Sequence, residues 1–138
     1  MSISLEQYFM GRDKQYPCDP QIRLNATQLL ARVDTLLLVY TAATNNEVTI
    51  VNSGWRPPAI NACVKGASAT SLHMTGEAVD LHDEDGALDV WLASPQGQQT
   101  MAKCELWHES PTDTPRWAHL QSRRFGSFKE GGSRTFFA

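Results

Sequence analysis

Apolar residues recur at helical spacing in one long stretch of the N-terminal third. Within residues 25–40 they lie three or four positions apart, which predicts a helix with one apolar face. Asn25, followed three residues later by Gln28, is typical of a capping box and predicts the start of this helix. A second such pattern, Ser4 with Gln7, predicts a short helix before it. The apolar face that we expect in the core consists of Leu29, Leu30, Val33, Leu36, Leu37 and Tyr40.

Further along the chain, apolar and polar residues alternate in short stretches. Strands are predicted over residues 47–52, 77–82, 106–108 and 117–121. Short helices are predicted over residues 58–65, 87–93 and 96–104. This order indicates an α+β fold with a small antiparallel sheet and flanking helices, because a parallel sheet would need longer helices between its strands. No repeat or linker-like stretch interrupts the pattern, so residues 1–138 are predicted to form a single domain.

The composition is that of an ordinary water-soluble protein, with 41% apolar and 20% charged residues. The net charge of −3 provides no basic field, so we expect no nucleic-acid partner. The longest apolar run, residues 36–40, is too short to span a membrane. We expect a monomer. One local basic cluster is interpreted as a solvated face or a substrate rim, and it consists of Arg116, Arg123, Arg124 and Lys129.

The cysteines and the N-terminus both bear on where the protein is found. The three cysteines form no C-x-x-C pair, which excludes a zinc ribbon, and their odd, sparse count favours a reducing compartment. The first 13 residues include acidic and polar residues where a signal peptide needs a basic segment and an apolar run. We therefore expect the protein to be made in the cytoplasm and to stay there initially.

Two histidines and an aspartate form a candidate zinc site. His73 and Asp80 lie in S-L-H-M-T-G-E-A-V-D, and His119 lies in W-A-H-L-Q. Gly76 permits a tight turn that returns His73 beside the strand, and side chains on one face of neighbouring strands about 5 Å apart can converge on one ion. Three protein ligands leave a fourth position open, as in catalytic zinc sites. A single histidine in a strand is more often a hydrogen-bonded residue than a ligand, so the interpretation depends on the motifs around it.

Those motifs resemble the zinc D-alanyl-D-alanine metallopeptidases. That family includes D,D-carboxypeptidases and phage L-alanyl-D-glutamate endopeptidases, and shares its fold with hedgehog signalling domains. The resemblance rests on S-x-H-x-x-G-x-A-x-D, on W-x-H and on the upstream S-G-W-R, and it runs from about residue 48 to residue 121. It implies that His73, Asp80 and His119 bind Zn²⁺.

The same resemblance gives roles to two further residues. Arg56 would neutralise a substrate carboxylate or the oxyanion of a tetrahedral intermediate, for which its planar set of donors is suited. The alternative for Arg56 is a surface ion pair. Ser71, two residues before a ligand, could hydrogen-bond the substrate terminus.

One departure from the family pattern concerns the general base. Many members place a carboxylate three residues before the last histidine, and this chain has Arg116 there, which cannot accept a proton. Either another residue is the base or catalysis is lost. Glu109 is our first candidate, because its strand is expected to pair with the strand of His119, although it could also be a solvated residue at a strand end. Asp113 and His108 are the next candidates.

Four other residues have two interpretations each. His82 shares a strand face with Asp80 and could orient a ligand, or it could be an exposed residue before a turn. Tryptophans 55, 107 and 117 could form walls of a cleft, but at least two of them are expected to pack in the core, because the side chain is large and amphipathic.

The resemblance implies a zinc peptidase that hydrolyses an amide bond in bacterial cell-wall peptides. The expected substrate is a peptidoglycan stem peptide or another D-Ala-containing peptide. A phage or prophage lysis protein, or a virion hydrolase, fits the missing signal peptide, because a holin or the virion would deliver it to the wall. Two alternatives stay open: a non-catalytic, zinc-stabilised binding or virion structural module of the same fold, and a cytoplasmic dipeptidase that cleaves free D-Ala-D-Ala. The presence of a carboxylate beside the metal distinguishes the enzyme from the binding module.

Overall fold

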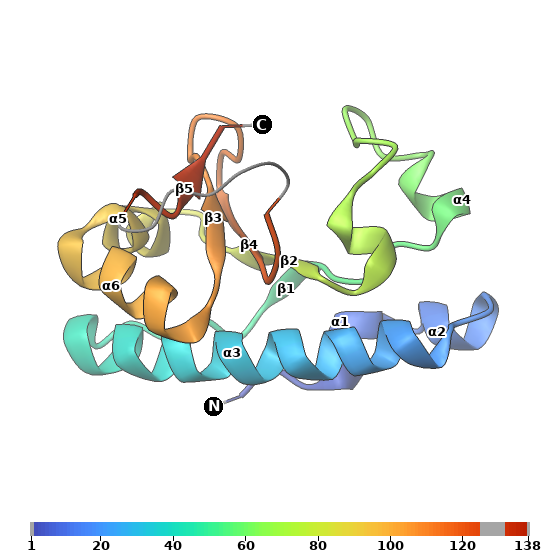
Figure 1. Ribbon diagram of the computed structural model, residues 1–138, viewed down its shortest axis with the longest axis horizontal. Coiled ribbons are helices and arrows are strands. Elements are labelled where there is room, and N and C mark those ends of the chain that lie inside the picture. The colour runs from blue at the N-terminus through green and yellow to red at the C-terminus, as the bar shows by residue number, and fades with distance from the viewer. Residues whose placement is uncertain (1, 125–131, 138) are drawn as a thin grey trace.

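A long helix lies beneath a small sheet, with shorter helices at both ends (Figure 1). The computed structural model describes residues 2–124 and 132–137. The helices are α1 (Leu5–Phe9), α2 (Arg12–Gln15), α3 (Pro20–Thr44), α4 (Pro58–Asn61), the 3-10 turn η1 (Leu72–Thr75), α5 (Ala87–Ala93) and α6 (Pro95–Cys104). The strands are β1 (Val51–Ser53), β2 (Ala78–His82), β3 (Trp107–Glu109), β4 (Trp117–Gln121) and β5 (Thr135–Phe136).

The long helix α3 begins six residues earlier than the capping-box pattern predicts, with its N-cap at Asp19 in place of Asn25. Asp19 is its N-cap, because its side chain accepts a hydrogen bond from the backbone of Gln21, and Pro20 occupies the first turn. Asn25 therefore lies inside the helix, and its side chain donates to the carbonyl of Thr75 at 3.0 Å. The capping box of Ser4 and Gln7 at α1 is confirmed.

The sheet has the order β1-β2-β4-β3-β5. The first four strands are antiparallel, and Asp80 of β2 lies directly opposite His119 of β4. The prediction of an antiparallel sheet is wrong for its last strand, because β5 pairs with β3 in parallel, Glu109 opposite Phe136. Strand β1 is also shorter than predicted, and its register with β2 shifts between Val51 and Ser53. The α+β class, with a small sheet and flanking helices, is confirmed.

The core lies between α3 and the sheet. The apolar face of α3 is buried as predicted, and Leu29, Val33 and Leu36 are fully inaccessible to solvent. Trp55 and Trp107 are buried, which confirms the prediction that at least two tryptophans pack in the interior. Packing of this kind keeps β2 and β4 rigid, and these two strands carry candidate ligands. Among the described residues, no helix is both long and apolar enough to cross a membrane.

Candidate metal centre

His73 lies in η1, a single 3-10 turn that is capped at its start by Ser71 and ends at Gly76. The side chain of Ser71 accepts a hydrogen bond from the backbone of His73 at 3.2 Å and caps the turn. Gly76 ends it with a φ of 78°, a left-handed conformation that glycine adopts without strain, as the sequence predicted. The His73 Nδ1–H donates to the carbonyl of Gly54 at 2.8 Å, since a carbonyl can only accept. Its Nε2 is therefore left with a free lone pair.

Gly54 lies against the backbone of α1. A Cβ built on Gly54 would be 1.9 Å from the carbonyl oxygen of Tyr8, so no larger residue fits without moving the backbone. The Trp55 amide donates to this same Tyr8 carbonyl at 3.3 Å. The absence of a side chain at position 54 thus lets the loop approach α1 closely and places the Gly54 carbonyl within hydrogen-bonding distance of His73 Nδ1.

Gly54→Ala is expected to destabilise the protein by about 3 kcal/mol, the upper range for overpacking. The added Cβ would clash with backbone atoms of Tyr8, which cannot move aside as a flexible side chain could. The midpoint of urea denaturation measures the loss. Ser53→Ala, at the half-buried neighbouring position, serves as the control and should shift the midpoint little. Equal midpoints for wild type and Gly54→Ala would contradict the close approach.

Asp80 bridges the two histidines. Its Oδ1 lies 2.8 Å from Nδ1 of His119, and its Oδ2 lies 3.2 Å from Nε2 of His73. One ligand atom from each of the three residues lies within 4.8 Å of the others. We call these three residues the His–Asp–His cluster. The sequence predicted them as ligands, and the turn at Gly76 and the β2–β4 register bring them together.

Burial and charge shift the pKa values in this cluster. Burial lowers the pKa of His73 and favours the neutral imidazole, which is the form that ligates metals. Burial also acts to raise the pKa of the Asp80 carboxyl, but the two imidazoles outweigh it and hold that pKa well below its ordinary range. The pKa of His119 is lowered by burial and raised more strongly by its contact with Asp80. Asp80 is therefore ionised, the form in which a carboxylate can bind a metal.

The cluster fits a metal ion such as zinc. Two imidazole nitrogens and a carboxylate oxygen are the donor set of catalytic zinc sites. Nε2 of His73 is buried and makes no hydrogen bond, because the proton of the neutral ring is on Nδ1 and Nε2 has none to donate to the Asp80 oxygen 3.2 Å away. A buried nitrogen without a partner costs free energy, and a coordinated ion would relieve that cost. His82 is exposed, and its ring contacts Glu84 at 3.8 Å, so of its two interpretations the exposed one matches the structure.

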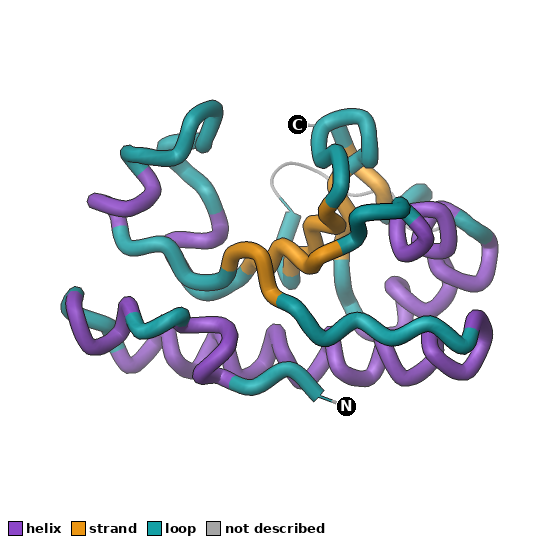
Figure 2. Tube along the Cα trace, turned by 180° about the vertical axis from the view of Figure 1, so that it is seen from behind, coloured by secondary structure: helices purple, strands orange, loops and turns teal. Residues whose placement is uncertain are grey.

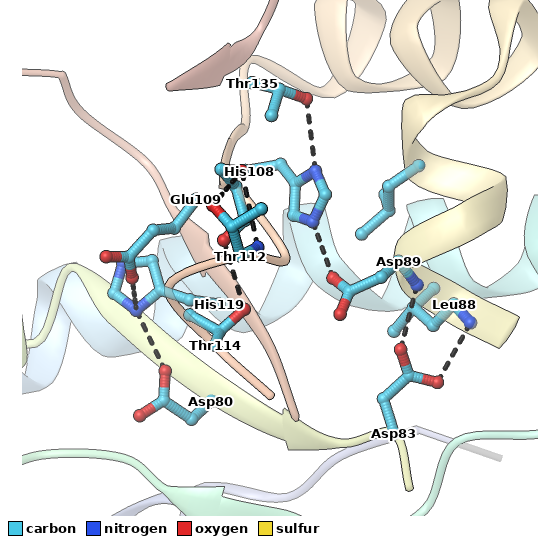
Figure 3. A network of polar contacts seen from close by, with 12 residues as sticks. Asp80, Asp83, Leu88, Asp89, His108, Glu109, Thr112, Thr114, His119 and Thr135 are labelled. Carbon is cyan, nitrogen blue, oxygen red and sulfur yellow. Dashed lines mark hydrogen bonds and ion pairs between the residues drawn. The ribbon is translucent and has the colours of Figure 1, made fainter. Parts of the chain in front are cut away.

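Glu109 stands beside the cluster. Its Oε2 lies 3.8 Å from Nδ1 of His119, the same nitrogen that faces Asp80 (Figure 3). The side chain is largely buried, and this burial raises the pKa of its carboxyl. The predicted pairing of its strand with that of His119 is confirmed, since Trp107 and His108 lie opposite Gln121 and Leu120. Glu109 is thus within a few ångströms of the position where a metal would lie.

His108 points the other way. Its Nε2 lies 2.6 Å from Asp89 of α5, its Nδ1 lies 3.2 Å from Thr135, and the side chain is fully buried (Figure 3). Side chains alternate along a strand, so if Glu109 faces the cluster, its neighbour must face α5. The candidacy of His108 as the base is therefore a wrong prediction. Asp113 is exposed and lines the same cleft as Glu109.

Arg56 lies beside η1 and is almost completely buried, with 9% of its surface exposed. Its guanidinium donates to Oγ of Ser71 at 3.3 Å, and its backbone amide donates to the carbonyl of His73 at 3.0 Å. Its Nε is buried without a partner, which leaves the group able to bind an anion. This placement does not match a surface ion pair. Ser71 holds both Arg56 and the turn that carries His73.

The cluster lies in a cleft of about 610 Å³ between two walls. One wall is the segment from α4 to η1, and the other carries β3, β4 and β5; the two rise on opposite sides above the sheet in the rear view of Figure 2. Trp117 lines the cleft, as one of the predicted wall tryptophans. Two aromatic residues at the end of the described chain, which had no recognisable pattern in the sequence, line it too: Phe136 of β5 and Phe137, which follows it.

The predicted basic cluster separates in the structure. Arg124 lines the cleft, which agrees with a substrate rim. Arg123 instead pairs with Glu77 through two hydrogen bonds of 3.0 and 3.1 Å. Arg116 is exposed in a turn, where its carbonyl accepts from the Asp83 amide, and lies outside the lining of the cleft. Lys129 lies outside the described residues.

Comparison with known proteins gives the family. The sequence model of the family described as peptidase M15 matches residues 11–106, well over half of the chain. The match includes Arg56, Ser71, His73 and Asp80, and it ends before Glu109 and His119. None of the curated proteins with which the sequence was compared matches it significantly. Peptidases of this family depend on zinc, and the chain has a cluster that could hold it. The chain belongs to the peptidase M15 family of metallopeptidases.

Proposed function

We propose that the protein is a zinc-dependent peptidase that hydrolyses an amide bond in the stem peptides of bacterial peptidoglycan, with His73, Asp80 and His119 as the zinc ligands. The observation that carries the proposal is the Glu109 carboxylate 3.8 Å from Nδ1 of His119, because it supplies a base beside the cluster. The proposal includes a fold of the hedgehog and D,D-peptidase type, which the order and spacing of the three ligands support.

The side chains around the cluster have complementary roles in this reaction. A bound zinc ion supplies Lewis acidity, polarising the scissile carbonyl and lowering the pKa of a neighbouring water. Glu109 accepts the proton of the attacking water and passes it to the amine that leaves when the C–N bond breaks. Arg56 binds the negative charge that develops on the carbonyl oxygen, or a carboxylate of the substrate. Ser71 holds the Arg56 guanidinium and can accept or donate a further hydrogen bond to the substrate end.

The alternative is a non-catalytic binding or virion structural module. Such a module would need no carboxylate beside its metal, so the position of Glu109 favours the enzyme. We propose further that the protein is encoded by a phage or prophage and reaches the wall through a holin or on the virion. The third candidate, a dipeptidase that cleaves free D-Ala-D-Ala, differs from the first in its substrate.

Digestion of purified peptidoglycan by the zinc-loaded protein tests the proposal. New amine and carboxyl ends, identified by mass spectrometry, give the bond that is cleaved, and a chelator-treated sample is the control. Cleavage of free D-Ala-D-Ala with no release from the wall would establish the dipeptidase. If the protein binds zinc and peptidoglycan but cleaves neither substrate, the binding module is correct and the enzyme proposal fails.

Arg56→Ala is expected to lower kcat/KM by roughly 10²-fold, or about 3 kcal/mol, with zinc still bound, because it removes a donor to the developing oxyanion. Arg56→Lys should restore only part of the loss, since an ammonium cannot provide two parallel donors. Steady-state kinetics on a released stem peptide measure both variants, and zinc content confirms that the site is intact. Full activity of Arg56→Ala would reduce Arg56 to a structural residue.

A further inference from the structure

Gln121 contacts the ring nitrogen of His119 that faces away from Asp80. Its Oε1 lies 2.7 Å from Nε2 of His119, and both residues are buried. The amide nitrogen of Gln121 lies 2.6 Å from the carbonyl oxygen of Arg123. Gln121 thus connects a candidate metal ligand to the backbone that follows β4.

The orientation of this amide is determined by chemistry. A backbone carbonyl can only accept, so the Gln121 NH₂ must face Arg123 and its oxygen must face His119. With the amide reversed, two oxygens would lie 2.6 Å apart and repel each other. The oxygen can only accept as well, so Nε2 of His119 carries a proton. The ionised Asp80 carboxylate 2.8 Å from Nδ1 also accepts, so without a metal Nδ1 is protonated too, and Nδ1 is the nitrogen that gives up its proton when a metal binds.

The acceptor at Arg123 is itself fixed in place. The Arg123 side chain makes two hydrogen bonds to the Glu77 carboxylate, and the Ser122 amide donates to the Glu77 carbonyl at 3.0 Å. These contacts hold the end of β4 against the residue that precedes β2. A continuous series of hydrogen bonds therefore connects Glu77, Arg123, Gln121 and His119.

We infer that Gln121 is a positioning residue that commits His119 to bind a metal through Nδ1, the nitrogen that faces both Asp80 and Glu109. The inference rests on the proposed zinc site. An imidazole whose Nε2 lacked an acceptor could rotate or hold its proton on Nδ1, and the ring would then offer its lone pair away from the cluster. Partners of this kind around metal-bound histidines contribute roughly 10- to 100-fold to metal affinity.

Two variants test the role of the acceptor. Gln121→Leu removes the acceptor at similar size. Gln121→Glu keeps an oxygen facing Nε2 but loses the hydrogen bond to the Arg123 carbonyl. Zinc dissociation constants from competition with a chelator should rise by roughly 10- to 100-fold in Gln121→Leu and by clearly less in Gln121→Glu, because only the second variant keeps the acceptor. Gln96→Leu is the matched control, because Gln96 also accepts a side-chain hydrogen bond, from Trp91, but lies on α6 outside the lining of the cleft.

A spectroscopic measurement separates positioning from general destabilisation. Long-range ¹H–¹⁵N NMR of the zinc-loaded protein reports which nitrogen of His119 keeps a proton and which binds the metal. We expect the proton on Nε2 and the metal on Nδ1 in wild type and in Gln121→Glu, and a mixture of the two binding modes in Gln121→Leu. Wild-type zinc affinity in Gln121→Leu, or a proton on Nδ1 in zinc-loaded wild type, overturns the inference. If wild type itself binds no zinc, the proposed function fails, whereas a wild type that binds zinc together with an unchanged affinity in Gln121→Leu overturns the inference alone. If Gln121→Leu does not fold, Gln121→Met gives the same comparison.

Discussion

Glu109→Gln is expected to keep zinc and stability while the rate of peptide hydrolysis falls by roughly 10²- to 10⁴-fold, the usual contribution of a general base. The amide matches the carboxylate in size and can still hydrogen-bond, but it cannot accept the proton of the attacking water. The loss should appear in kcat, because Glu109 acts on the reacting water. Single-turnover and steady-state assays on a released stem peptide measure it.

Two other variants make this result specific. Asp113→Asn tests the second carboxylate of the cleft, which is exposed where Glu109 is largely buried. Arg116→Ala tests the position that carries the base in many relatives and that here lies outside the lining of the cleft, so its rate should be unchanged. An active Glu109→Gln together with an inactive Asp113→Asn would assign the base to Asp113.

The proximity of the three residues of the His–Asp–His cluster could be predicted because it depends on local rules. Strand alternation and a glycine-permitted turn were enough to bring His73 and Asp80 together, and antiparallel pairing placed His119 opposite Asp80. The same alternation could have excluded His108, since two successive strand residues cannot both face the cluster. It could also have found Gln121, which lies two residues after His119 on the same strand face. In both cases the signal was present in the sequence.

Other features depend on contacts that a local pattern does not contain. Strand β5 has two residues, Thr135 and Phe136, and forms only because their backbone pairs with β3 in parallel. The sequence offers two capping signals for the start of α3. The prediction used Asn25, but the Asp19–Pro20 pair is the stronger signal, and the helix begins there. The closeness of Gly54 to Tyr8 likewise follows from the packing of a loop against α1. These contacts shape the cleft, whereas the ligands follow from the strands.

His73→Ala is expected to abolish stoichiometric zinc binding, because Nε2 of His73 is the buried nitrogen without a partner and two ligands alone hold zinc weakly. His119→Ala should have the same effect, and Asp80→Ala should weaken binding. Metal analysis after dialysis should give about one zinc per wild-type chain, as expected for a three-ligand site. His82→Ala is the matched control, since His82 lies on the same strand as Asp80 but is exposed, and it should keep its zinc.

Thermal unfolding of the same variants gives a second, independent measurement. A ligand that binds only the folded state stabilises it by about 2.7 kcal/mol at a free concentration 100 times its Kd. Zinc should therefore raise the Tm of wild type and of His82→Ala by roughly 10 °C, given the size of the chain. It should leave the Tm of His73→Ala unchanged, because no site remains to link zinc to folding. A zinc-dependent rise in the Tm of His73→Ala equal to that of wild type would show that the metal binds elsewhere, and the assignment of the cluster would then be wrong.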